Sequence, residues 1–217
     1  VLFWDSDGVF GLSVWSLAVC VVIVCVLLVN TDLFLAKPQQ TALDTLANAD
    51  LQTTSGEDRQ FKALELWEET GAIIMAFLCK EASELSSLRP QLDILGVPLY
   101  AVVKENVGME IQNFRPYFNG EIFVDEKKCF YGCKTRKMGY LGLLRFGVVK
   151  NILQAWLQGY MGNKKGEGFI LGGLYVIGPG CQGILMEHHE KEFGDKADLR
   201  SVTEAVRKVE KSDPDLA

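Results

Sequence analysis

The sequence predicts an α/β domain with helices on both faces of a mixed sheet, preceded by an N-terminal hydrophobic helix. Two apolar runs, residues 72–78 and 99–103, have the length and composition of strands that are buried on both faces. A helical pattern lies between them, and strand, helix and strand within about 30 residues form a βαβ unit with a parallel strand pair. Shorter strand patterns and turns in the second half favour antiparallel pairs in the same sheet.

The composition excludes several classes of protein. The chain has 217 residues, a net charge of −6 and 23% charged residues, which is typical of one globular domain with an appendage. Its acidic balance gives no support to nucleic-acid binding, which usually shows a basic patch. Six cysteines are too few for a disulfide-stapled miniprotein, and they lack paired zinc-ligand spacing. The glycine-rich stretch 166–180 lacks phosphate-loop and dinucleotide spacing. We therefore expect no nucleic-acid partner, metal or cofactor.

The uncharged run 9–29 is a candidate membrane anchor. It reaches the roughly 20 apolar residues that a helix needs to cross a bilayer. A cleaved signal peptide is less favoured, because no basic residue precedes the run and no small-x-small site follows it. A buried helix packed on the domain is the other alternative. Lys37 after the run favours a cytosolic main domain, and Cys20 and Cys25 within it read as apolar fillers.

The pattern along the chain predicts four segments. These are an N-terminal hydrophobic segment, 1–30; a polar linker with one short helix, 31–58; the main domain, 59–210; and a polar tail, 211–217. Within the main domain, Gly96 and Pro98 end the helix of the βαβ unit. The other expected elements are helices at 41–51, 61–71, 108–117, 140–160 and 199–209, a hairpin at 121–131, and strands at 169–177 and 183–187 joined by a Gly-Pro-Gly turn.

Cys79 is the strongest single candidate for chemistry. It lies where the apolar run 72–78 ends and the helical pattern begins. Unpaired backbone N–H groups and the helix dipole stabilise a thiolate at a helix N-terminus, so we expect the pKa of this thiol to fall. Lys80 would add to this effect, while Glu81 and Glu84 would oppose it. A thiolate here could attack a disulfide or be oxidised by a peroxide. The alternative is that Cys79 is a small buried hydrophobe.

The remaining cysteines and histidines give weaker patterns. Cys129 and Cys133 form a C-x-x-x-C followed by three basic residues, which would lower their pKa values and suit resolving thiols. The alternative is that they are ordinary surface or half-buried thiols. Cys181, beside the Gly-Pro-Gly turn, is expected to be exposed and incidental. His188 and His189 are adjacent on a predicted strand, so they point to opposite faces and cannot share a metal.

Several separate blocks of the chain resemble the peroxiredoxin-like 2 family, an AhpC/TSA-like, selenoprotein U-related group. They are FKALELWEETGAIIMA, FLCKEASELSSL, LGVPLYAVVKE, YFNGEIFVDEKK, GEGFILGGLYVIG and QGILMEHHEKEFGD, within about residues 31 to 209. The resemblance implies a thioredoxin-like fold and antioxidant activity on peroxides or protein disulfides. It also implies a C-x-x-C-type centre at the first strand–helix junction, and a reductant such as glutathione or a thioredoxin-type protein. Cytoplasmic and secretory settings, and restraint of inflammatory signalling and osteoclast differentiation, come with the family.

The chain departs from the family pattern at this centre. The second cysteine of the pair maps onto Cys79, but the position of the first is Ala76. A short basic loop with Pro and Gly precedes the pair in the family, whereas here Ala76 joins Phe77 directly. MAFLCKE offers no Gly, Pro, Asn or Ser for the turn that a strand-to-helix change requires. Either the protein lacks the loop, or gene prediction skipped a segment containing a UGA-encoded selenocysteine. We favour the second explanation.

Two readings of the function stay open, and whether the chain is an enzyme stays open with them. No Pro-x-x-x-Thr-x-x-Cys pattern precedes Cys79, and no proline precedes the strand at 121 as a cis-proline would, so efficient peroxide turnover is not expected. The first reading is a thiol redox protein with Cys79 as the reacting group, resolved by a small thiol, a protein reductant, or Cys129 or Cys133. The second is a membrane-tethered binding module without turnover. A purely structural membrane protein fits the compact domain less well.

Overall fold

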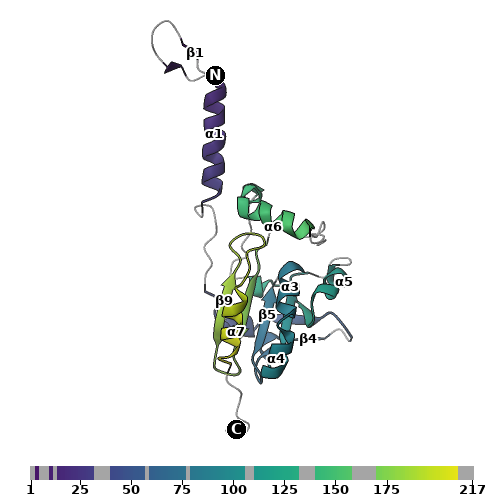
Figure 1. Cartoon of the computed structure of the whole chain (residues 1–217). Helices are drawn as coiled ribbons and strands as arrows, with labels where there is room; N and C mark the ends of the chain where they lie inside the picture. The colour runs from purple at the N-terminus through teal and green to yellow at the C-terminus, as the bar shows by residue number, and fades with distance from the viewer. Residues whose placement is uncertain are drawn as a thin grey trace.

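The protein has a mixed-sheet domain from which one helix projects. The structure, a computed structural model, describes residues 3–4, 10–11, 14–31, 40–56, 59–76, 79–105, 110–131, 140–157 and 170–209. Figure 1 shows helix α1 (Val14–Val29) standing away from the domain toward the N-terminus. The short antiparallel strands β1 (Phe3–Trp4) and β2 (Phe10–Gly11) precede it. Within the described residues, no helix has both the length and the apolar character that crossing a bilayer requires.

The domain is built on a seven-stranded sheet with the order β4-β3-β7-β6-β5-β8-β9. Strands β5, β6 and β7 are parallel to one another, and the remaining pairs are antiparallel. The βαβ unit and the mixed sheet are therefore confirmed. The strands are β3 (Asp50–Thr53), β4 (Gln60–Lys62), β5 (Ala72–Ala76), β6 (Leu99–Val103), β7 (Glu121–Val124), β8 (Gly173–Ile177) and β9 (Ile184–His189).

Helices cover both faces of the sheet, as predicted. All five residues of β5 are buried, and successive side chains enter different cores because strand side chains alternate between faces. Ile73 and Met75 pack with helices α3, α4, α5 and α7, whereas Ile74 packs with α2, η2 and η4. The helices are α2 (Leu43–Ala47), η2 (Ala63–Leu66), α3 (Cys79–Ser86), α4 (Arg89–Leu95), α5 (Glu110–Phe114), η3 (Arg115–Tyr117), η4 (Cys129–Tyr131), η5 (Tyr140–Leu144), α6 (Phe146–Leu157) and α7 (Leu199–Val206).

Glycine is favoured at two positions of the βαβ unit, before β5 and between α4 and β6. Gly71, just before β5, has a φ of 69°, and a Cβ there would lie 2.8 Å from the carbonyl oxygen of Ile177. A larger residue would therefore both strain the backbone and push β8 away from β5. Gly96 ends α4 in the left-handed conformation, with a φ of 70°, as the sequence indicated.

The expected hairpin at 121–131 is wrong. Strand β7 is followed by the 3-10 helix η4 instead of a second strand, because the Asp125 carboxylate accepts a hydrogen bond from the backbone N–H of Phe130 at 2.9 Å. The expected single helix before Gly96 is also two helices. Pro90 lies in the first turn of α4, and since it has no N–H it cannot continue the hydrogen bonds of α3.

The segment expected as a linker contributes a strand to the sheet. Strand β3 pairs with β4 on one side and with β7 on the other, and Leu51 within it is fully buried. Leu46 of the preceding helix α2 is also fully buried. The sequence DLQT has a single apolar residue, so no alternating pattern marked it as a strand.

If β3 is part of the core, Leu51→Ala should lower the free energy of unfolding by about 2–5 kcal/mol, the cost of a cavity at a fully buried leucine. Leu64→Ala is the control, because Leu64 is 36% exposed and should lose much less. Urea unfolding followed by circular dichroism measures both. Equal losses for the two variants would show that β3 is not part of the cooperative core.

Candidate functional site

Cys79 lies at the N-terminus of a helix that follows the central strand. Two residues separate Ala76, the last residue of β5, from Cys79, the first residue of α3. The backbone around Cys79 therefore has the strand-to-helix arrangement that the sequence predicted. A residue in this position lies beside backbone N–H groups that have no partner within the helix. This arrangement suits a nucleophilic thiol, and the assignment of Cys79 as the reacting group stays a prediction.

The position expected for a first redox residue is inside the strand. Ala76 is fully buried and is paired with Gly173 of β8. A side chain there points into the core beneath the sheet, together with Ile74 and Tyr175. In the sequence only residues 77 and 78 lie between the end of β5 and the start of α3, and neither is a cysteine.

Other polar residues follow the neighbouring strands at the same edge of the sheet. Because β5, β6 and β7 are parallel, their carboxyl ends share one edge, where ligand sites of open α/β sheets usually lie. Lys104 and Glu105 follow β6, and Asp125 follows β7. Glu190 directly follows His189, the last residue of β9. His189 pairs with Gly173 of β8, and Gly173 pairs with Ala76 at the carboxyl end of β5, so Glu190 lies at the same edge.

Asp125 is a fully buried carboxyl group at this edge. One carboxylate oxygen, Oδ2, accepts the hydrogen bond from the Phe130 N–H, and within the described residues Oδ1 has no hydrogen-bond partner. Burial raises the pKa of Asp125, and the backbone N–H groups of Phe130 and Lys128 oppose this rise. Asp125 therefore holds its proton to higher pH than an exposed aspartate does.

A second buried acid, Glu190, lies at the same edge. Its Oε2 atom accepts a hydrogen bond from the Gly172 N–H at 2.8 Å, and the residue is 1% exposed. The buried Tyr131 hydroxyl donates to the carbonyl oxygen of Val102 at 3.0 Å. Burial first, and then the charge of Asp125, raise the pKa of Tyr131 well above its usual value, with a smaller contribution from Glu190. Tyr131 therefore acts here as a neutral hydrogen-bond donor.

A chain of polar contacts fixes η4 to the strands beside β5. The Tyr175 hydroxyl donates to the carbonyl oxygen of Phe130 at 3.2 Å and lies 3.4 Å from the Thr41 hydroxyl. Glu187 joins the same group, since its Oε1 accepts the Thr41 N–H at 3.0 Å and lies 2.6 Å from His189 Nε2. These bonds connect the start of the domain, η4, β8 and β9, and so make the edge of the sheet rigid.

The structure does not place the other candidate thiols with Cys79. Cys129 is half-buried in η4, and burial and then the charge of Asp125 raise its pKa. Lys127 opposes this rise, and the basic residues expected to lower the pKa, Lys134, Arg136 and Lys137, lie outside the described residues. Cys133 lies outside the described residues. Cys181 is exposed, as predicted, and Cys20 and Cys25 are exposed on α1.

The two adjacent histidines have different partners, as their alternation on a strand predicted. His189 Nε2 lies 2.6 Å from Glu187, whereas His188 Nε2 lies 3.9 Å from Asp195. In the part of the chain that the structure describes, no three His, Cys, Asp or Glu side chains come together as metal ligands would.

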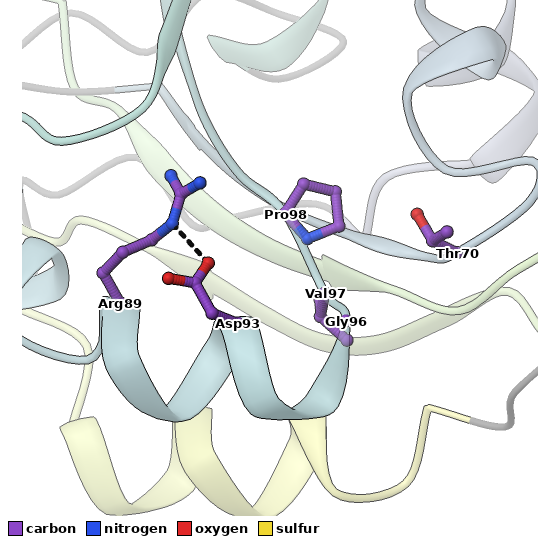
Figure 2. Close-up of a pocket in the computed structure, with 6 residues that line it drawn as sticks. All are labelled: Thr70, Arg89, Asp93, Gly96, Val97 and Pro98. Carbon is purple, nitrogen blue, oxygen red and sulfur yellow. Dashed lines mark hydrogen bonds and ion pairs between the residues drawn. The ribbon is translucent and has the colours of Figure 1, made fainter.

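An open pocket lies at the opposite edge of the sheet from Cys79. Figure 2 shows Arg89 and Asp93 of α4 on one side of it and Thr70 and Pro98 on the other. Arg89 Nε pairs with Asp93 at 2.7 Å, so the pocket's cation is already neutralised by its own helix. The pocket lies at the amino ends of β5 and β6, away from the edge where the candidate thiol is found.

The sheet order, with helices on both faces, defines a thioredoxin-like domain of the peroxiredoxin-like class. The family model described as "AhpC/TSA antioxidant enzyme" matches residues 84–192, about half of the chain. The chain belongs to the peroxiredoxin-like 2A family within this class, as its similarity to curated relatives shows.

Three vertebrate relatives illustrate the similarity. Peroxiredoxin-like 2A from Danio rerio is 60% identical over 91% of this chain and 98% of its own length. The Rattus norvegicus protein of that name is 54% identical over 98% of this chain and 97% of its own length. The Homo sapiens protein is 53% identical over 95% of this chain and 95% of its own length. Among solved structures, the bacterioferritin comigratory protein of Xanthomonas campestris is similar to this chain with a TM-score of 0.49 and 14% sequence identity. The match covers 79% of this chain and 94% of the Xanthomonas campestris chain.

Sequence reasoning missed the buried acids of the site. Asp125 had a detectable sign, because it directly follows a four-residue strand whose last three residues are buried. Such a position places a carboxyl group at the carboxyl edge of the sheet. Glu190 had none, because it lies in a run of charged and histidine residues that reads as solvated surface.

We expect Asp125→Asn to remove the contribution of this carboxyl group to the pH dependence of stability. The folded protein binds the Asp125 proton more tightly than the unfolded chain, so the wild type loses stability as pH rises from about 4 through the raised pKa. The amide keeps the acceptor for the Phe130 N–H but does not ionise. The free energy of unfolding of the variant, relative to wild type, should therefore increase with pH in urea titrations.

Asp198→Asn provides the control of opposite sign. Hydrogen bonds from Ser201 lower the pKa of Asp198, so its contribution to stability is present at neutral pH and is lost as pH falls. The Asp198 variant should therefore become less stable, relative to wild type, as pH rises. A flat or falling difference for Asp125→Asn would contradict the assignment of a raised pKa.

Proposed function

We propose that this chain is a thiol-based antioxidant or redox-regulatory protein that reduces peroxides or protein disulfides through Cys79. The observation that carries the proposal is the start of α3 at Cys79, with two residues between it and the central buried strand β5. Helix N-termini favour the thiolate form of cysteine, which is the nucleophile in both reactions. Membership of a family of antioxidant enzymes supports the same chemistry.

The reaction with a peroxide proceeds in two stages. The Cys79 thiolate attacks one peroxide oxygen, the O–O bond breaks, and the departing oxygen takes up a proton as water or an alcohol, leaving a sulfenic acid. A second thiol then attacks the sulfenic sulfur, releasing water and forming a disulfide. Two electrons from glutathione or a thioredoxin-type dithiol restore both thiols.

The identity of the second thiol limits the rate of this cycle. Burial raises the pKa of Cys129, which lowers its thiolate fraction relative to an exposed cysteine and disfavours it as the resolving group. Glutathione or a protein dithiol is therefore the better resolving partner for the chain as it stands. A partner on a loop before Cys79 would be faster, since it would react within the molecule.

The alignments support a missing segment. The match to the Danio rerio relative spans 208 residues but covers 91% of this 217-residue chain, about 197 residues. About ten residues of the relative therefore have no counterpart here. A basic loop carrying a cysteine or selenocysteine between Ala76 and Phe77 is our proposal for part of this difference.

We place the redox domain in the cytoplasm, with membrane association through residues 9–29. The uncharged sequence of this segment and the exposure of its apolar side chains on α1 support the association. A secretory-pathway, endoplasmic-reticulum or secreted setting is the alternative. The family resemblance adds restraint of inflammatory signalling and osteoclast differentiation as the cellular role to be tested.

A binding module without turnover is the second candidate function. One specific observation favours it: the position of the expected first redox residue is Ala76, buried within β5. A chain that has lost one redox residue could still use its thioredoxin-like surface to bind a regulatory partner.

Cys79→Ser should abolish peroxide-dependent sulfenic acid formation, because serine cannot form this intermediate. Dimedone labelling after addition of hydrogen peroxide measures it, and labelling should fall at least about tenfold. Cys181→Ser is the matched control, because this exposed cysteine should be dispensable. Labelling that persists in Cys79→Ser and disappears in Cys181→Ser would overturn the assignment.

The same variant separates the two functions in cells. A redox protein should lose its effect on inflammatory signalling when Cys79 becomes serine, whereas a binding module should keep it. Cytokine release from stimulated macrophages expressing either form is the measurement.

The natural protein's peptide spanning residues 71–89 should be heavier than the sequence given and should carry two alkyl groups. This result is expected because a redox pair needs a second thiol or selenol near Cys79. Mass spectrometry after alkylation measures it, together with translation of the genomic sequence between the codons for Ala76 and Phe77. A peptide of the given mass with one alkyl group would favour the binding module.

A further inference from the structure

Helix α6 carries an apolar stripe on its outer side. Five large apolar residues recur at i, i+3, i+4, i+7 and i+8, which is the spacing of one helix face. All five are exposed, and the fraction reaches 73% at Trp156 and 77% at Leu157; they are Val149, Ile152, Leu153, Trp156 and Leu157. Val148, on the other side, is buried against the domain. The stripe therefore faces away from the core, opposite to the usual orientation of an amphipathic helix.

The beginning of α6 is bonded to the end of α1. The Arg145 guanidinium donates to the carbonyl oxygens of Val29 and Thr31 at 3.1 and 2.8 Å. The N–H of Phe146 donates to Asn30 Oδ1 at 2.8 Å. A cation at the carbonyl end of a helix is favourable. The two helices thus leave the domain from one point, and Figure 1 shows them at the same end of the molecule.

Helix α1 extends the exposed apolar surface. Its 16 residues contain no charge, and its apolar side chains are exposed on every side, with Val22 at 61% and Leu27 at 60%. A helix that is apolar all round is normally buried in a protein or in lipid. The α1 and α6 surfaces together exceed what a monomer usually leaves in water.

The apolar stripe lies within the basic part of the sequence. Residues 132–169 contain seven Lys or Arg residues and one acid, a net charge of +6 in a chain whose total is −6. Lys150 is an exposed example on α6 itself, directly after Val149. Clusters of basic residues next to an apolar helix face are typical of binding to anionic lipid surfaces.

We propose that α6 is an interfacial helix that lies on an anionic lipid surface beside α1. The apolar stripe enters the boundary between headgroups and acyl chains, while the exposed Lys150 contacts the headgroups. A second copy of the chain fits the surface less well, because it would bring two segments of charge +6 together. The proposal is independent of the thiol chemistry at Cys79.

The fluorescence of Trp156 tests whether α6 touches lipid. The full chain is mixed with vesicles of brominated phosphatidylcholine, alone or with phosphatidylserine. The emission difference between wild type and Trp156→Phe isolates Trp156, since the other tryptophans are common to both. We expect this difference to be quenched severalfold in the anionic vesicles, and to recover in the uncharged vesicles or at high salt.

Two charge variants sharpen the test. Lys150→Glu should weaken the docking of α6 about tenfold, because it removes one favourable headgroup charge and adds an unfavourable one. Arg200→Glu is the matched control on α7, where the residue is also exposed, and should leave the quenching unchanged. If the chain sediments with anionic vesicles while Trp156 stays unquenched, α1 binds alone and the proposal is wrong. Concentration-dependent dimers that shield Trp156 without lipid would also overturn it.

Discussion

Strand β5 has backbone partners along both edges and side chains buried on both faces, and this constraint fixes the rest of the domain. A strand so enclosed can change direction only beyond its end, so the next helix begins at the carboxyl edge of the sheet. The parallel pairing with β6 and the antiparallel pairing with β8 bring the ends of four further strands to that edge. The sheet therefore determines where helix α3 begins, and Cys79 is the first residue of that helix.

The same edge has an interior that is more polar than its strands suggest. Asp125 and Glu190 are both buried there, and each accepts a backbone N–H that shapes the local chain. Burying carboxyl groups is costly unless they are hydrogen-bonded or protonated, and burial accordingly raises the pKa of Asp125. Tyr131 and Tyr175 add neutral hydroxyl donors around them. Hydrogen bonds to the backbone thus satisfy these polar groups inside the domain.

The sequence predicted the helices and strands that have an apolar run or a clear periodicity of their own. It missed the elements that form only through contacts with residues distant in sequence. The buried strands β5 and β6, the strands around Gly178 and the closing helix α7 all follow from apolar runs or periodicity. Strand β3 has one buried leucine, so only its pairing with β4 and β7 reveals it. The hairpin after β7 was wrong because a hydrogen bond from Phe130 to the Asp125 side chain decides the turn. The placement of Cys79 was predictable, while its surroundings required contacts distant in sequence.

The position of α6 relates the proposed lipid-binding surface to the edge of the sheet where α3 begins. Asn151 of α6 donates to the carbonyl oxygen of Phe193, and Arg145 pairs with Glu192, both just beyond β9. The end of β9 lies at the same edge of the sheet as Ala76, through the pairs with Gly173. An interfacial α6 would therefore turn the edge carrying Cys79 toward the lipid surface.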